Sequence, residues 1–226
     1  MIPYYDEDGI TIYRGDCRVY LRHLPKSDLL LTDPPYVIKH AHGGGIAHTR
    51  AFYREGALDG LCDFNLEHYG ELLSAASDQI VAFGSRDQVS QWPPFMLKHF
   101  GHFDLHVWHK PNAIPFVNNT WKSDLEYIFL GWRSKHHAKV HCSEKSKLFQ
   151  SGIDTENLHP TQKPLSLMLK YLRVLDADSV IDPFMGSGTT LVAAKQMGIK
   201  AIGIELEEKY CEVAVRRLAQ GVLEFA

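Results

Sequence analysis

Leu29-Leu30-Leu31-Thr32-Asp33-Pro34-Pro35-Tyr36 begins as a short apolar run of strand length and stops at an acid, two prolines and a tyrosine. Because proline lacks a backbone N–H and fixes its own φ angle, the strand has to end at this point. An apolar run without alternation is typical of an open α/β sheet, whose ligand sites lie outside the carboxyl ends of the strands. The sequence therefore predicts that Asp33 and Tyr36 are held at such a site.

The groups that follow this strand suit the capture of an aromatic amine. The exocyclic amine of adenine or cytosine is a poor nucleophile because its lone pair is delocalised into the ring. The Asp33 carboxylate and the Pro34 carbonyl can each accept one N–H, which draws the nitrogen toward tetrahedral geometry and stabilises the positive charge that develops there. Tyr36 can stack on the base, a contact worth about 1–3 kcal/mol. The alternative is an ordinary proline turn with an acid that caps a helix.

A second pattern of strand, turn and helix lies near the end of the chain, at Val180-Ile181-Asp182-Pro183-Phe184-Met185-Gly186-Ser187-Gly188-Thr189-Thr190. Gly186 and Gly188 permit a tight turn and the close approach of a ligand to the backbone. Glu205 ends the next expected strand, 17 positions after Gly188, where an acid can accept the hydroxyls of a ribose. No lysine follows the glycines, and the third glycine of the dinucleotide fingerprint is missing. A nucleoside without pyrophosphate fits this turn better than a phosphate loop does.

Apolar periodicity predicts alternating strands and helices around these two stretches. We expect strands at 9–13, 28–32, 79–84, 103–109, 125–130, 179–181 and 200–204, and helices at 17–24, 67–77, 86–99 with a break at the two prolines, 164–175, 189–197 and 207–218. This order predicts an α/β fold with a doubly wound, Rossmann-like, mostly parallel sheet and an antiparallel edge. We expect one domain over residues 1–226, with a mobile loop at about 37–60 and a small insertion at about 134–158.

The composition excludes several classes of protein. A chain of 226 residues with 45% hydrophobic and 23% charged residues has enough apolar side chains for one sizeable core. No apolar run approaches the ~18 residues that a membrane-spanning helix needs, and residues 1–6 lack the layout of a signal peptide. The four cysteines lie far apart without a C-x-x-C pair, so we expect free thiols and a cytoplasmic location.

The two stretches together resemble the motifs of the amino-group DNA methyltransferases, which use S-adenosylmethionine. A third motif, His159-Pro160-Thr161-Gln162-Lys163-Pro164, precedes the glycine segment, and this motif order is similar to that of the circularly permuted beta group. Segments 15–17 with Leu21, 81–85 and 202–205 also resemble the family, so that only about 37–60 and 134–158 lack a match. The resemblance implies a circularly permuted class I methyltransferase fold.

The resemblance also implies a role for each motif. Asp33, Pro34, Pro35 and Tyr36 would form the catalytic motif and hold a base flipped out of the duplex. Lys163 would be a candidate partner of the cofactor's carboxylate. The implied reaction is direct methyl transfer from sulfonium to amine, without a metal or a covalent enzyme intermediate. The cofactor-binding residues implied are Asp16 and Cys17 near the adenine, Glu205 at the ribose, and His159, Thr161, Lys163, Asp182, Phe184, Gly186, Ser187, Gly188, Thr189 and Thr190 around the methionine part.

The expected target is adenine N6 in double-stranded DNA, because Asp at the first motif position is commoner in that group, whereas cytosine-N4 enzymes more often have Ser. Cytosine N4 stays the alternative. About 25 residues separate Trp132 from His159, too few for an independent recognition domain, so either the site is short or a homodimer reads it. A separate restriction endonuclease stays open as a further partner. The basic residues expected to contact DNA are Lys39, Arg50, Arg54, Arg133, Lys135 and Lys139.

Other interpretations are weaker. Thirteen histidines suggest a metal, but an alternating strand puts His102 and His106 on one face and His109 on the other, and no cysteine spacing supports zinc. Protein glutamine methyltransferases use Asn in place of Asp33 and place the cofactor motif first, and this chain does neither. A catalytically silent DNA-binding protein with the same fold is disfavoured by the intact catalytic motif.

Overall fold

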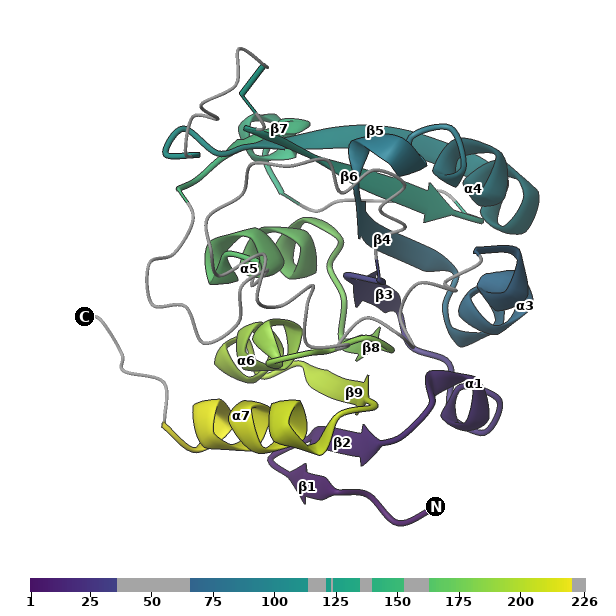
Figure 1. Cartoon of the computed structure of the whole chain (residues 1–226), viewed down its shortest axis with the longest axis vertical. Helices are drawn as coiled ribbons and strands as arrows, with labels where there is room; N and C mark the ends of the chain where they lie inside the picture. The colour runs from purple at the N-terminus through teal and green to yellow at the C-terminus, as the bar shows by residue number, and fades with distance from the viewer. Residues whose placement is uncertain (36–65, 114–120, 123, 135–139, 153–162, 221–226) are drawn as a thin grey trace.

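The computed structural model describes residues 1–35, 66–113, 121–122, 124–134, 140–152 and 163–220. Its strands are β1 (Tyr5–Glu7), β2 (Ile10–Arg14), β3 (Leu29–Thr32), β4 (Gln79–Gly84), β5 (His102–His109), β6 (Leu125–Trp132), β7 (Leu148–Gln150), β8 (Ser179–Asp182) and β9 (Lys200–Glu205). They form a nine-stranded sheet in the order β1-β2-β9-β8-β3-β4-β6-β5-β7 (Figure 1).

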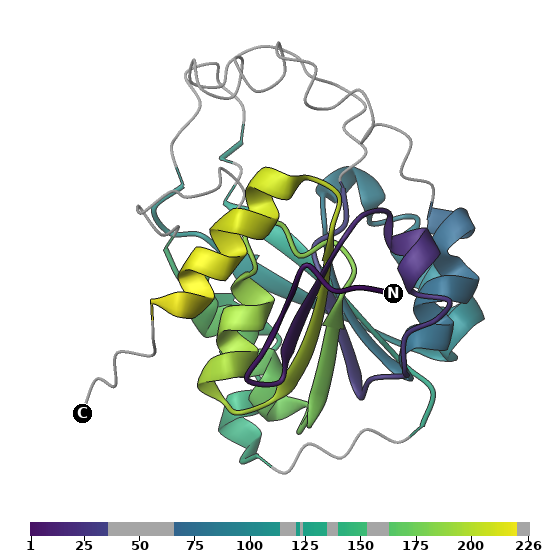
Figure 2. The ribbon, with the colours of Figure 1, turned by 90° about the horizontal axis from the view of Figure 1, so that it is seen from below.

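Helices cover both faces of this sheet. They are α1 (Cys17–Tyr20), α3 (Leu66–Ala76), α4 (Trp92–Phe100), α5 (Leu165–Val174), α6 (Thr189–Gln196) and α7 (Glu208–Ala219). Two perpendicular views show α5, α6 and α7 on one face and α1, α3 and α4 on the other (Figures 1 and 2). The expected doubly wound α/β arrangement is confirmed.

The centre of the sheet is parallel, antiparallel pairs lie on both sides of it, and the edge strand β7 pairs in parallel with β5. Strands β2, β9, β8, β3 and β4 are paired in parallel, while β6 runs antiparallel to β4 and β5, and β1 antiparallel to β2. The carboxyl ends of β3, β8 and β9 therefore open on the same edge of the sheet, where open α/β folds place their ligands.

The continuous apolar run of β3 has a simple cause. Leu29 and Leu31 pack into the core beneath α5, α6 and α7, whereas Leu30 packs into the core beneath α3 and α4. All three are fully buried. Because a side chain on either face of this strand is removed from water, each leucine contributes about 2 kcal/mol and no polar alternation is tolerated.

Most predicted boundaries differ from the observed ones by one or two residues, and the larger differences have local reasons. Strands β1 and β7 were not predicted because each has three residues and lies at an edge, too short for a periodic signal. Helix α1 has four residues rather than the eight expected. Helix α4 begins at Trp92, so that Pro93 and Pro94 lie in its first turn, where a missing N–H breaks no helical hydrogen bond.

Candidate functional site

Loops of the candidate site leave neighbouring strands at one edge of the sheet. β3 pairs with β8, and β8 pairs with β9. The first loop carries Asp33, the second carries the glycine turn, and the third follows Glu205, the last residue of β9. A hydrogen bond of 2.7 Å from Thr32 Oγ1 to Asp182 Oδ1 joins the last residues of β3 and β8, from which the first two loops leave, although these residues are 150 positions apart. The two sequence motifs therefore lie side by side.

Asp182 is an internal anchor of the glycine turn. Besides Thr32, it accepts hydrogen bonds from Thr190 Oγ1 at 2.7 Å and from the Phe184 amide at 3.1 Å, and it is 3% exposed. Burial raises the pKa of its carboxyl group to about 6, although the two hydroxyls and the amide act in the opposite direction. The sequence assigned Asp182 and Thr190 to the cofactor. In the structure the Thr190 hydroxyl donates to Asp182, which also accepts from Thr32 and from the Phe184 amide.

Ser187 and Thr189 are likewise engaged within the fold. Arg217 of α7 donates from Nη1 to the Ser187 carbonyl at 2.7 Å and to Thr189 Oγ1 at 3.1 Å. Both side chains are buried. Phe184 is only half-buried, and its ring meets Tyr69 of α3 edge-on at 5.7 Å between centroids. The side chains of Ser187 and Thr189 are thus engaged within the protein, and the part of the turn in cofactor binding stays a prediction.

The two glycines of the turn differ in the space that a side chain would have. Gly186 and Gly188 both have positive φ angles, of 51° and 78°. A Cβ on Gly188 would lie 2.8 Å from Ala214 Cβ on α7, whereas a Cβ on Gly186 would meet nothing within 4 Å. Gly188 is thus required for helix packing, while Gly186 leaves open space beside the backbone.

This difference predicts unequal effects of alanine at the two positions. We expect Gly186→Ala to destabilise the protein by about 1–2 kcal/mol through its positive φ alone. Gly188→Ala should cost more, about 2–4 kcal/mol, because the contact with Ala214 adds overpacking. Urea unfolding of both variants, and of Gly188→Ala with and without Ala214→Gly, measures the two contributions. Equal destabilisation by the two glycine variants would contradict the packing argument.

Glu205 is a fixed acceptor at the tip of β9. Its Oε1 accepts from the Glu207 amide at 2.8 Å and its Oε2 from the Gly186 amide at 3.0 Å. Burial raises the pKa of its carboxyl group, and the backbone donors oppose the rise. The half-buried carboxylate has further lone pairs for the hydroxyls of a ribose.

The loop after β2 lies against the same strand tip, since the Gly15 amide donates to the Glu205 carbonyl at 2.8 Å. Asp16 caps α1 by accepting from the Arg18 amide at 2.8 Å and also pairs with the Arg18 guanidinium. Cys17 is 5% exposed, and burial raises the pKa of its thiol to about 12. The structure thus places Asp16, Cys17 and Glu205 at one edge of the sheet, and their contacts with the cofactor stay a prediction.

The Asp33 carboxylate begins a row of alternating charges. Its Oδ2 lies 2.6 Å from Lys163 Nζ, which lies 3.0 Å from Glu126 Oε1, and Lys110 Nζ lies 3.5 Å from Glu126 Oε2. The Lys163 side chain is 5% exposed and that of Glu126 is 12% exposed. The sequence directed Lys163 to the cofactor's carboxylate, but the structure directs its ammonium group to Asp33 and Glu126.

Lys163 stays charged in this buried place. Burial lowers the pKa of its ammonium group, but the charges of Asp33 and Glu126 outweigh burial and the resulting pKa lies above the ordinary value. The ammonium group also lies 5.3 Å from the centre of the Phe83 ring. Sequence reasoning missed Glu126, although a single acid inside the apolar strand 125–130 was the signal that could have found it.

Several predicted site residues lie outside the described residues. Of the catalytic motif, Asp33, the buried Pro34 and the half-buried Pro35 are described. Those not described are Tyr36, His159, Thr161 and the basic residues Lys39, Arg50, Arg54, Lys135 and Lys139, together with the expected loop 37–60.

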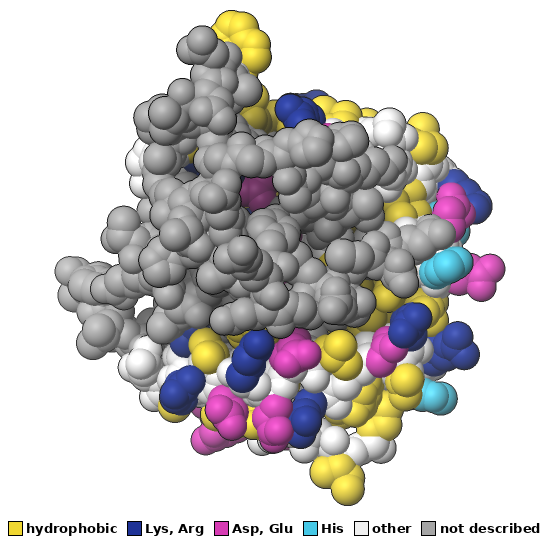
Figure 3. Space-filling view, in the orientation of Figure 1, with side chains coloured by type: hydrophobic (Ala, Val, Ile, Leu, Met, Phe, Trp, Pro, Cys, Tyr) yellow, Lys and Arg dark blue, Asp and Glu magenta, His cyan; other side chains and the backbone are white. Residues whose placement is uncertain are grey.

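Arg133 is described but does not lie at this site. It follows the last residue of β6, at the edge where β4 begins, and an eight-residue strand separates the two edges by about 25 Å. Its guanidinium group donates to Asp78 Oδ1 at 2.9 Å and to the His99 carbonyl at 3.2 Å. The prediction that Arg133 contacts DNA at this site is therefore wrong, because the structure places it at the opposite edge of the sheet. On the face in Figure 3, the described Lys and Arg side chains are interspersed with Asp and Glu.

Two kinds of feature are absent from the described ranges, a metal-binding cluster and a membrane-spanning helix. They contain no group of three or more His, Cys, Asp or Glu side chains that could hold a metal ion. Among the same residues no helix combines the length and apolar character that crossing a bilayer requires.

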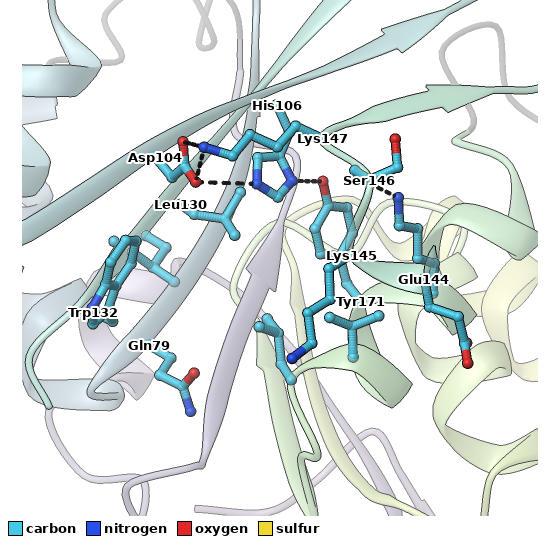
Figure 4. A pocket seen from close by; sticks show the side chains of 15 residues that line it. Gln79, Asp104, His106, Leu130, Trp132, Glu144, Lys145, Ser146, Lys147 and Tyr171 are labelled. Carbon is cyan, nitrogen blue, oxygen red and sulfur yellow. Dashed lines mark hydrogen bonds and ion pairs between the residues drawn. The ribbon is translucent and has the colours of Figure 1, made fainter. Parts of the chain in front are cut away.

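A pocket of about 280 Å³ lies at the edge opposite Asp33, between the start of β4, the end of β6 and α5 (Figure 4). His106 Nδ1 lies 3.1 Å from the Tyr171 hydroxyl, and His106 Nε2 lies 3.7 Å from Asp104 Oδ2. Asp104 also pairs with Lys147 at 2.7 Å. Burial lowers the pKa of His106 to about 4, which the charge of Asp104 only partly opposes.

This buried histidine predicts a pH dependence of stability. Between its ordinary pKa of about 6.5 and the folded value of about 4, the unfolded chain binds a proton that the folded chain does not, so stability falls on acidification. This difference in pKa lowers the free energy of unfolding by up to about 3 kcal/mol on acidification. Asp182, with its raised pKa of about 6, acts in the opposite direction between about pH 4 and 6. The measurement therefore compares urea unfolding of the wild type with that of His106→Gln. From pH 7 to pH 4 the wild type should lose about 3 kcal/mol more than the variant, and parallel curves would contradict the assignment.

Comparison with known proteins agrees with this geometry. The family model described as DNA methylase, N6_N4_Mtase, matches residues 27–216. The type II methyltransferase M.HinfI of Haemophilus influenzae is 26% identical over an alignment of 249 positions. The alignment covers 93% of this chain and 68% of that protein. The type II methyltransferase M2.LlaDCHI of Lactococcus lactis subsp. cremoris is 25% identical over an alignment of 250 positions. The alignment covers 97% of this chain and 93% of that protein.

Solved structures are similar over most of their length. The crystal structure of the M1.HpyAVI–SAM complex has a TM-score of 0.69 and 28% identity, with 92% of this chain and 99% of that chain covered. The cytosine-N4-specific PvuII DNA methyltransferase has a TM-score of 0.70 but 18% identity, with 99% and 90% covered, and so shares the fold. From the matched family model, the adjoining motif loops and these relatives, the chain belongs to the N6/N4 DNA methylase family.

Proposed function

We propose that this DNA methyltransferase transfers a methyl group to N6 of an adenine flipped out of duplex DNA. The observation that carries the proposal is the hydrogen bond from Thr32 to Asp182, because it holds the Asp33 loop beside the glycine turn. An amine bound at the first loop and a cofactor bound at the second would then be neighbours, which is the main requirement of a direct transfer between two bound reactants.

The described residues fit S-adenosylmethionine. Gly186 leaves open space beside the turn, and the Glu205 carboxylate is fixed by two backbone amides with acceptor capacity remaining for ribose hydroxyls. The neighbouring Asp16 and Cys17 loop supports a place for the adenine. When bound, the cofactor supplies a methyl group activated by a sulfonium.

The protein's part in the transfer is to shape and polarise the amine. Asp33 accepts one N–H and the Pro34 carbonyl accepts the other, which localises the nitrogen lone pair and stabilises the positive charge that grows on the nitrogen. Tyr36 stacks on the flipped base. The methylated nitrogen must lose one proton, and the Asp33 carboxylate that already accepts this N–H takes it and passes it to water.

Asp at the first position of the catalytic motif supports adenine over cytosine. The test incubates the protein with duplex DNA and methyl-labelled S-adenosylmethionine, digests the DNA to nucleosides and separates them. Label in N6-methyldeoxyadenosine supports the proposal, and label in N4-methyldeoxycytidine assigns the alternative target. Absence of label from DNA of varied sequence, with the cofactor bound, would refute the function.

We propose two copies of the chain on one duplex, because the segment between β6 and the third motif is short. Sedimentation of the protein with a methylatable duplex tests this, and a complex containing one copy would contradict it. The type II names of M.HinfI and M2.LlaDCHI support a restriction endonuclease as a separate partner that reads the same site. The free thiols of Cys17, Cys142 and Cys211 support a reducing cytoplasm as the location.

A further inference from the structure

We propose that Glu126 is a positioning residue of the methyl-transfer site, which holds Lys163 beside Asp33 and keeps the base clamp negatively charged. This inference rests on the proposed function. It concerns a residue of β6, outside the three sequence motifs and outside the glycine turn.

The geometry places Lys163 between two carboxylates. Its Nζ is 2.6 Å from Asp33 Oδ2 and 3.0 Å from Glu126 Oε1, and its side chain is 5% exposed. An ammonium group has three N–H donors and no preferred plane, so one carboxylate alone would leave it free to rotate around that partner. Glu126, held on a strand of the sheet, supplies the second direction. Asp33 then meets a fixed donor, and its carboxylate keeps a defined orientation toward the base.

Glu126 also changes the net charge beside the amine. Asp33 and Lys163 form a neutral pair, and Glu126 returns a net charge of −1 to the three groups. Methyl transfer moves positive charge from the sulfur of the cofactor to the amine beside Asp33. Three fixed groups with a net charge of −1 stabilise this movement more than a neutral pair does.

Lys110 provides a second charge that can be removed, with the opposite expected effect on the rate of methyl transfer. It lies 3.5 Å from Glu126 Oε2, while Lys163 contacts Oε1, and it partly neutralises that carboxylate. Removal of the Lys110 charge makes the cluster more negative, so it should leave the rate equal or higher. Removal of the Glu126 charge should lower the rate. A role in stability alone predicts that both variants lower the free energy of unfolding, because either one breaks a partly buried ion pair, and that neither changes kcat per folded molecule.

The test uses the full chain, duplex DNA and methyl-labelled S-adenosylmethionine. We expect Glu126→Gln to lower kcat by about 10- to 100-fold with KM for the cofactor within about twofold of the wild type. Glu126→Asp, which keeps the charge, should recover part of the loss, and Lys110→Met should turn over at least as fast as the wild type. The matched control is Glu67→Gln, which removes one carboxylate from the exposed Lys98–Glu67 pair of 2.8 Å and should leave kcat unchanged.

Thermal unfolding of each variant shows which of them are folded at the assay temperature, and kcat is normalised to folded protein. Wild-type turnover by Glu126→Gln, or equal losses in Glu126→Gln and Lys110→Met, would overturn the inference. If Glu126→Gln does not fold, Glu126→Asp is compared with Lys110→Met instead. The inference then requires a lower kcat for Glu126→Asp and a kcat at or above the wild type for Lys110→Met, and equal losses would overturn it. Lack of DNA methylation by the wild type refutes the proposed function instead, so the two failures are distinguishable.

Discussion

Asp33→Asn leaves a folded protein that binds S-adenosylmethionine but transfers its methyl group to DNA on the order of 10³-fold more slowly. The neutral amide keeps the shape of the side chain and can still accept from Lys163, so the fold is preserved. What is lost is the negative charge beside the amine, at the point where positive charge develops in the transition state. Label transfer to DNA measures the rate, and calorimetric titration measures cofactor binding.

A matched control separates this effect from the loss of any paired carboxylate. Asp78 pairs with Lys26 at 2.7 Å and with Arg133 at 2.9 Å, at the opposite edge of the sheet. Asp78→Asn should therefore turn over within about twofold of the wild type. If Asp33→Asn retained a tenth or more of wild-type activity, Asp33 would not be the group that polarises the amine.

The second large effect concerns stability. Lys163→Met removes the cation between Asp33 and Glu126 and leaves two partly or largely buried carboxylates close together. Breaking a buried pair in this way costs about 3–5 kcal/mol in free energy of unfolding, and the low exposure of Lys163, 5%, means that water screens little of it. Urea unfolding at pH 7 measures the loss.

Two comparisons sharpen this prediction. In Lys163→Met the two carboxylates should have raised pKa values in the folded state, so the lost stability returns as the pH falls and they take up protons. The double variant Lys163→Met, Glu126→Gln should recover part of it at pH 7 because one buried charge is gone. The exposed pair Lys26–Asp78 is the control, and Lys26→Met should cost less than about 1 kcal/mol. A loss from Lys163→Met no larger than this control would refute the buried-charge argument.

The fold was predictable because its signals are local. The triple leucine before Asp33 marks a strand buried on both faces, and Pro34 and Pro35 mark its end, whatever the rest of the chain does. Gly186 and Gly188 mark a turn because only glycine adopts their positive φ at low cost. Period and turn chemistry act within a few residues, which is why the order of strands and helices followed from the sequence. The short edge strands β1 and β7 carry no such period and were missed.

Within the site, the sequence by itself determined which groups can act: an acid with a proline carbonyl for an amine, a glycine turn for a nucleoside, and an acid for a ribose. Only the tertiary structure decided what each group touches. In the structure Thr190 donates to Asp182 within the turn, and Arg133 lies at the far edge of the sheet beside Asp78. Lys163 contacts Asp33, 130 positions away in the sequence, and also Glu126 from another strand. The physical reason is that a charge is satisfied by whichever partner the packing brings within about 3 Å, and for distant segments that partner is chosen by the pairing of strands, which no local pattern of residues encodes.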